Sequence, residues 1–178
     1  MQENEGTVWI STVIYILISL AVISSLLIAI RPKIEEARDR YTINYMVNVF
    51  QSLNSLVYDI NEVQGTRRVF EIKITKGEMK IIPERDRIEW QITTRFKFSE
   101  PGQEVKIGDV GVITLENRGK IDTFLFLNYT TPINLTTASD NEGDNLTLTQ
   151  SPTPYKLLIE NKGAPATSVN NTIFISKL

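Results

Sequence analysis

The chain has no cysteine and no histidine among its 178 residues. Disulfides, thiolate nucleophiles, Cys/His zinc sites and histidine general bases are therefore excluded. The sequence also shows no nucleophile elbow, no phosphate-binding glycine loop and no spaced pair of carboxylates. We therefore predict that the protein is not an enzyme and that it carries neither a metal nor another cofactor.

The chain also has no excess of positive charge. It contains 19 Lys and Arg residues and 21 Asp and Glu residues, which gives a net charge of −2. A nucleic-acid-binding surface needs concentrated positive charge to replace counterions, so we expect no nucleic-acid partner. The densest acidic segment is DNEGDN, residues 140–145. Its glycine stands at the fourth place rather than the sixth place of an EF-hand loop, which favours a solvent-exposed turn over a calcium site.

A run without any charged residue extends from Thr7 to Ile30, TVWISTVIYILISLAVISSLLIAI. As a helix it would be about 36 Å long, enough to cross a hydrocarbon core of about 30 Å. A cleaved secretory signal would have a basic start, a shorter apolar stretch and a small-residue cleavage site. The pattern therefore predicts a membrane-compatible helix over 7–30, in preference to a signal peptide or to the buried core helix of a soluble domain.

Small residues recur at four-residue spacing within this run, at Ala21, Ser25 and Ala29. They share one face of a helix, where they allow the backbone of another helix to approach closely. We expect this face to pack against a second helix. The alternative is a lone anchor in which small residues are merely tolerated.

Helical spacing continues beyond the charged segment Arg31-Pro32-Lys33. Apolar residues recur there at i, i+3, i+4 and i+7, with polar residues between them. These apolar positions are Met46, Val49, Phe50, Leu53, Leu56, Val57, Ile60 and Val63. Pro32 removes one backbone donor, and Gly65 is a favourable helix end. The pattern predicts one helix from Thr7 to Gln64, whose part 31–64 is an amphipathic extension that lies against a folded domain.

After Gly65 the hydrophobic period changes from helical to alternating, and Gly/Pro turn signals separate short strands. The predicted strands are 69–75, 78–82, 88–98, 102–107, 109–117, 123–130, 146–149, 155–160 and 171–178, with turns that include 117–119 and 161–163. Residues 65–178 are thus expected to form a β-rich globular domain. The predicted fold class is α+β, a long N-terminal hydrophobic-then-amphipathic α-helix followed by an antiparallel β-sandwich-like domain.

This layout resembles that of archaeal type IV pilin-like and archaellin-like proteins. The resemblance is carried by a short polar leader that ends in glycine (MQENEG, residues 1–6), the apolar run directly after it, its amphipathic extension and a C-terminal β domain. It implies cleavage between Gly6 and Thr7 by a prepilin peptidase-like enzyme. It also implies that the apolar helix first lies in the cell membrane and then packs with copies of itself in the core of an extracellular surface filament.

Two positions depart from the pattern of this family. The leader has Glu3 and Glu5 where such leaders usually carry Lys or Arg. Ser11 stands where many bacterial pilins have a glutamate that pairs with the amino terminus of a neighbour. Assembly would therefore depend on apolar packing rather than on that ion pair.

Four N-x-Thr sequons lie near the C-terminus, at Asn128, Asn134, Asn145 and Asn170, where chance would give about two in the whole chain. They favour a glycosylated domain outside the cell, and accidental sequons in a Thr-rich domain are the alternative. Basic residues follow the apolar run but do not precede it, and the positive-inside rule alone would place the β domain in the cytoplasm. These basic residues are Arg31, Lys33, Arg38 and Arg40.

We therefore expect a structural subunit of an archaeal type IV pilus-like filament. One alternative is a single-pass membrane-anchored protein with an extracellular β-sandwich binding domain. Another is a minor pilin-like subunit of a filament or of a secretion machine. The N-terminus of the natural protein would separate the first two, because a processed pilin begins at Thr7 and a permanent anchor begins at Met1.

Overall fold

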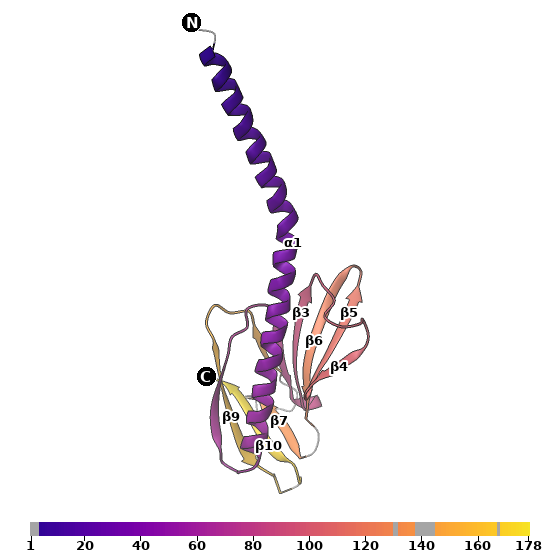
Figure 1. Cartoon of the computed structure of the whole chain (residues 1–178). Coiled ribbons are helices and arrows are strands. Elements are labelled where there is room, and N and C mark those ends of the chain that lie inside the picture. Colours follow the sequence, from indigo (N-terminus) through magenta and orange to yellow (C-terminus); the bar gives the residue numbers. More distant parts are fainter. Residues whose placement is uncertain (1–3, 130–131, 138–144, 167) are drawn as a thin grey trace. The chain divides into compact units, whose positions relative to one another are not determined.

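The computed structural model describes residues 4–129, 132–137, 145–166 and 168–178, with side chains from residue 9 onward. One long α-helix precedes a series of β-strands (Figure 1), which is the predicted α+β fold class. The elements are α1 (Asn4–Asn61), β1 (Arg67–Ile72), β2 (Glu78–Ile82), the 3₁₀-helix η1 (Pro83–Arg85), β3 (Arg87–Thr94), β4 (Glu104–Ile107), β5 (Val110–Asn117), β6 (Lys120–Asn128), β7 (Ile133–Thr137), β8 (Leu146–Thr149), β9 (Tyr155–Gly163) and β10 (Asn171–Lys177).

The chain divides into two compact units. The N-terminal unit, Met1–Arg38, contains the first part of α1, and the C-terminal unit, Asp39–Leu178, contains the remainder of α1 and the strands. Pro32 lies inside α1, where its ring nitrogen cannot donate the backbone hydrogen bond of a helix interior.

The strands of the C-terminal unit form two sheets. One has four strands in the order β1-β9-β10-β7, and the other has six in the order β4-β5-β6-β3-β2-β8. Within the described strands, β7 and β10 pair in parallel and the other neighbours pair antiparallel. Among the described strands, β1 and β7 are therefore the outermost in the first sheet and β4 and β8 in the second.

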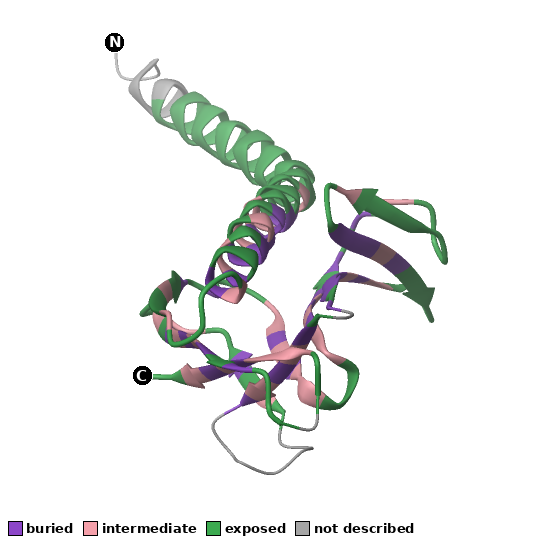
Figure 2. Cartoon of the chain, turned by 90° about the horizontal axis from the view of Figure 1, so that it is seen from below, coloured by how far each residue is buried: buried purple, intermediate pink, exposed green. Residues whose placement is uncertain are grey.

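One hydrophobic cluster joins α1 to both sheets. The predicted apolar stripe of the helix is buried in it at Met46, Phe50, Leu53, Val57 and Ile60, and Val49 and Leu56 pack against it. Figure 2 shows this stripe as the buried face of the C-terminal part of α1. The prediction for Val63 is wrong, because α1 ends at Asn61 and the Val63 side chain is 62% exposed.

The strand pattern of the sequence matches most of the two sheets, with several differences. The predicted strands 69–75 and 88–98 end earlier, at Ile72 and Thr94. Strand β7 was not predicted, and residues 161–163, predicted as a turn, lie inside β9. β7 is a five-residue segment whose hydrogen-bonding partner is the distant C-terminal strand β10. Such a parallel pair depends on long-range contacts that a local pattern does not contain.

Gly77 lies at a close approach between the β1–β2 connection and strand β3. Its φ is +85°, and a Cβ there would overlap the carbonyl oxygen of Gln91 and lie 3.0 Å from Trp90 Nε1. Gly65 has nearly the same φ, +81°, but no atom lies within 4 Å of a Cβ there. A side chain at Gly65 would therefore cost only backbone strain, whereas a side chain at Gly77 would cost the same strain and a steric clash as well.

Gly77→Ala is expected to lower the free energy of unfolding by about 1–3 kcal/mol more than Gly65→Ala. Both variants take on left-handed strain of about 1–2 kcal/mol, but only the first also overpacks the structure. Thermal unfolding of the full chain in detergent, followed by circular dichroism, measures the difference. Equal destabilisation by the two substitutions would show that the Gly77 turn has room for a side chain.

Candidate membrane-anchoring and packing surface

The N-terminal unit exposes an unusually apolar helix surface. Every side chain from Trp9 to Glu35 is exposed. Figure 2 shows this part of α1 as exposed. The large apolar side chains include Trp9, Ile10, Val13, Ile14, Tyr15, Ile16, Leu17, Ile18, Leu20, Val22, Ile23, Leu26, Leu27, Ile28, Ile30 and Ile34. Exposed apolar surface of this extent marks a membrane or a protein contact.

Among the residues that the structure describes, α1 is the one helix that is long and apolar enough to cross a membrane. The chain thus has a candidate membrane anchor near its N-terminus. Gly6 and Thr7, which flank the expected cleavage site, lie within α1, and the structure describes side chains only from Trp9 onward.

The face that carries Ala21, Ser25 and Ala29 suits close contact with another helix. All three side chains are small and exposed. The hydroxyl of Ser25 donates a hydrogen bond of 2.8 Å to the carbonyl oxygen of Ala21, and Ser19 does the same to Tyr15. Because these hydroxyls are satisfied within the helix, the face can enter lipid or an apolar interface without leaving them unpaired.

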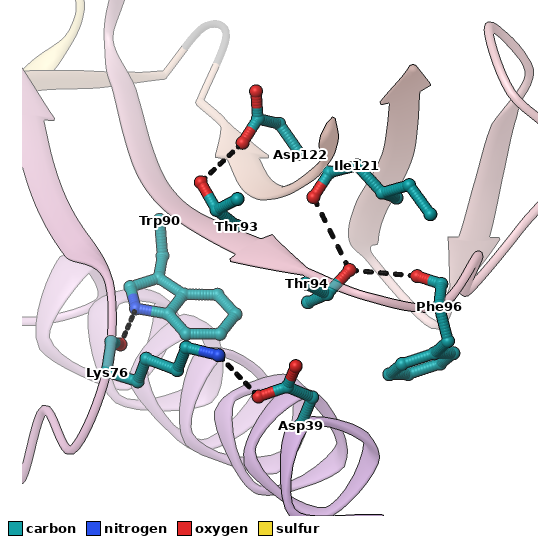
Figure 3. Close-up of polar contacts among 8 residues, drawn as sticks. All are labelled: Asp39, Lys76, Trp90, Thr93, Thr94, Phe96, Ile121 and Asp122. Carbon is teal, nitrogen blue, oxygen red and sulfur yellow. Dashed lines mark hydrogen bonds and ion pairs between the residues drawn. The ribbon is translucent and has the colours of Figure 1, made fainter. Parts of the chain in front are cut away.

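The first turn of α1 in the C-terminal unit is held to the sheets by polar contacts (Figure 3). The carboxylate of Asp39, whose side chain is only 6% exposed, lies 2.5 Å from Lys76 Nζ. Trp90 Nε1 donates to the Lys76 carbonyl oxygen at 3.2 Å, and the Arg40 guanidinium lies over the Phe96 ring at 5.3 Å. These contacts tie the helix to the β1–β2 connection and to the segment that follows β3.

The last turn of α1 is held by asparagine side chains. Nδ2 of Asn161, a fully buried residue, donates to the carbonyl oxygens of Ile60 at 3.0 Å and Asn61 at 3.2 Å. Nδ2 of Asn171 also donates to the Asn61 carbonyl oxygen, at 3.1 Å. The helix C-terminus would otherwise leave these carbonyl groups unsatisfied. Side chains from β9 and β10 thus act as the C-cap of α1.

Sequence reasoning missed both of these attachments. A signal for the first was present, because Asp39 lies four residues before Ile43 and seven before Met46, on the apolar stripe. A carboxylate on the buried face of a helix needs a cation or a hydrogen-bond donor beside it. No comparable signal pointed to Asn161, because its role depends on the pairing of β9 with β10.

The C-terminal unit contains all four sequon asparagines. Asn128 and Asn145 are exposed, and Asn134 and Asn170 are partly exposed. The acidic residues Asp140, Glu142 and Asp144 lie outside the described residues, so the predicted turn there has no structural description.

Titratable groups in the described residues form no cluster of three or more that could hold a metal ion. The shallow depression lined by Glu78, Lys80, Glu89 and Gln91 contains an ion pair of 2.8 Å between Lys80 and Glu78. The hydrogen bond from Glu78 raises the pKa of the Lys80 ammonium group. This arrangement is a surface ion pair between two residues of the same strand, β2.

Comparison of the chain with protein-family models, with curated proteins and with solved structures finds no significant match. The functional argument therefore depends on the exposed apolar helix and on the well-packed β domain that follows it.

Proposed function

We propose that the protein is a structural subunit of an archaeal type IV pilus-like surface filament, which assembles through its N-terminal helix. The observation that carries the proposal is the row of exposed apolar side chains from Trp9 to Ile34, joined in one chain to a β domain with its own core. The exposed helix needs an apolar environment, and the domain does not.

The energetic argument favours helix packing over dispersed subunits in water. Burial of a Leu- or Ile-sized side chain stabilises by about 1.5–3 kcal/mol, and α1 exposes about a dozen of these between Trp9 and Ile34. Two environments can cover them, the lipid bilayer and other copies of the helix. Head-to-tail contacts between identical subunits that do not close into a ring produce an open filament.

The proposed sequence of locations is the cell membrane first and the surface filament second. A prepilin peptidase-like enzyme would remove residues 1–6, and other copies of the chain would then replace lipid around the helix. The outward orientation of the β domain is supported by its four sequons. The basic flank after the apolar run favours a cytoplasmic domain by itself, so the outward orientation in this proposal depends on the sequons.

The N-terminus of the chain isolated from its natural cells tests this proposal. We expect the N-terminal peptide to begin at Thr7, as shown by mass spectrometry, and the chain to be present in surface filaments. A chain that begins at Met1 and stays in the membrane fraction would contradict the proposal and support a single-pass anchor. A chain that begins at Thr7 but forms only a trace of the filament mass would indicate a minor subunit.

A further inference from the structure

The two outermost described strands of the six-stranded sheet are β4 and β8, each four residues long. β8 (LTLT) contains neither a charged residue nor a proline, two of the features that keep an outermost strand from pairing with another chain. β4 (EVKI) has one charge of each sign, at Glu104 and Lys106. An uncharged strand such as β8 would therefore meet no like charge beside β4.

The directions of these two strands suit each other. All five neighbouring pairs in the order β4-β5-β6-β3-β2-β8 are antiparallel. Because the number of strands is even, β4 and β8 run in opposite directions. A second copy that extends the sheet in the same orientation would thus present its β8 antiparallel to β4, which is a standard sheet pairing.

The faces of the two strands also match. In β8, Leu148 is buried and both threonines are exposed. In β4, Val105 lies opposite the buried Val112 and thus on the core side of the sheet, but its side chain is 41% exposed. Because side chains alternate along a strand, a β8 strand with its leucines on this side would cover Val105. Its threonines would then lie beside the charged side chains of β4.

The β4–β5 hairpin (Figure 1) is held in place by α1. Nε2 of Gln51 donates to the carbonyl oxygen of Ile107, the last residue of β4, at 3.3 Å. Nδ2 of Asn54 donates to Oδ2 of Asp109, in the turn between β4 and β5, at 2.9 Å. A strand that is already fixed loses little conformational freedom when another strand pairs with it.

The strand β8 is fixed at its C-terminal end. The Tyr155 hydroxyl donates to the Thr149 carbonyl oxygen at 3.0 Å, and the Ser151 N–H donates to the Ile74 carbonyl oxygen at 3.0 Å. The remaining part of β8 that suits pairing with another chain is therefore 146–148.

We propose that β8 of one copy pairs antiparallel with β4 of the next copy, so that the six-stranded sheet continues from subunit to subunit along the filament. The partner is a second copy of this chain, because its two outermost strands match in direction, length and face. A contact between two different surfaces leaves one of each free at the ends, and it builds an open filament when the ring does not close. The inference rests on the proposed function, because helix packing supplies the high local concentration that so short a pairing needs.

Engineered cysteines test the pairing, because the chain has no cysteine of its own. Lys106→Cys and Thr147→Cys are combined in one full-length chain, and filaments sheared from cells that produce it are treated with a short bismaleimide. Directly opposite and diagonal positions on paired strands lie about 4.5–8 Å apart, within reach of this reagent. On denaturing gels we expect a ladder of dimers, trimers and longer chains, with at least five times more linked protein than from either single variant.

The single variants are the controls, and both are expected to remain monomeric. Dimers from Thr147→Cys alone would indicate pairing of β8 with β8, and dimers from Lys106→Cys alone would indicate pairing of β4 with β4. Either result would overturn the inference. Lys106→Cys with Glu71→Cys places the second thiol on β1, in the other sheet, and should also remain monomeric. A ladder from this pair would overturn the inference as well, because it would show contact that does not involve β8.

A second pair of cysteines across the same contact is Glu104→Cys with Thr147→Cys, and circular dichroism checks that each variant is folded. Filaments in which both β4–β8 cysteine pairs remain monomeric would overturn the inference alone. Absence of filaments from the unsubstituted chain would instead overturn the proposed function, and this inference with it.

Discussion

Ser25→Leu is expected to reduce surface filaments at least tenfold while leaving the C-terminal unit folded. Ser25 lies at the centre of the small-residue face, between Ala21 and Ala29, and its side chain is exposed in the single chain. A leucine there would hold a neighbouring helix at a distance and remove close backbone contacts. Ala29→Leu should have the same effect. Filaments are counted by negative-stain electron microscopy, and folding is followed by circular dichroism.

Ser24→Leu is the matched control, because it makes the same substitution one residue earlier. At 3.6 residues per turn, Ser24 lies about 100° around the helix from Ser25. It is therefore off the small-residue face, and we expect near-normal filament numbers. Normal filaments from Ser25→Leu and Ala29→Leu would contradict close packing at this face. Equal loss from Ser24→Leu would show that bulk is excluded around the whole helix.

Phe50→Ala is expected to lower the free energy of unfolding of the C-terminal unit by about 3–5 kcal/mol. Phe50 has no exposed surface and lies in the stripe by which α1 contacts the sheets. The loss is a large share of the roughly 5–15 kcal/mol that stabilises a typical domain. Chemical unfolding of the full chain in detergent, followed by tryptophan fluorescence and circular dichroism, measures it.

Tyr41→Ala serves as the control for this substitution. It removes an aromatic ring from the same helix, but the Tyr41 side chain is 73% exposed. Surface substitutions of this kind usually change stability by no more than about 0.5 kcal/mol. If Phe50→Ala costs no more than Tyr41→Ala, the second part of α1 does not belong to the domain core, and the packing described above is wrong.

The sequence predicted those parts of the fold that repeat locally. The uncharged run shows itself by its length and lack of charge, and the apolar stripe through Met46, Phe50, Leu53 and Val57 is periodic, so both helix parts could be inferred without knowledge of any partner. The predicted helix end at Gln64, inferred from Gly65, is wrong, because α1 ends at Asn61. Helix ends depend on capping groups, and here these come from β9 and β10.

Features that depend on long-range pairing were not visible in the sequence. β7 becomes a strand through its pairing with β10, and Asn161, in a segment that suggests a turn, is a buried cap of α1. The sequence positions of the sequons gave only the number of possible glycans, whereas the hydrogen bonds from the Tyr129 and Leu135 N–H groups to Asp86 bring the backbone next to Asn128 and next to Asn134 together.

The most direct test of filament assembly through the apolar helix is a helical reconstruction of filaments sheared from cells that produce the chain. The account predicts that Trp9–Ile34 from neighbouring copies pack together along the filament axis, with the β domains on the outer surface. Filaments that lack the chain, with all of it left in the membrane fraction, would contradict the account.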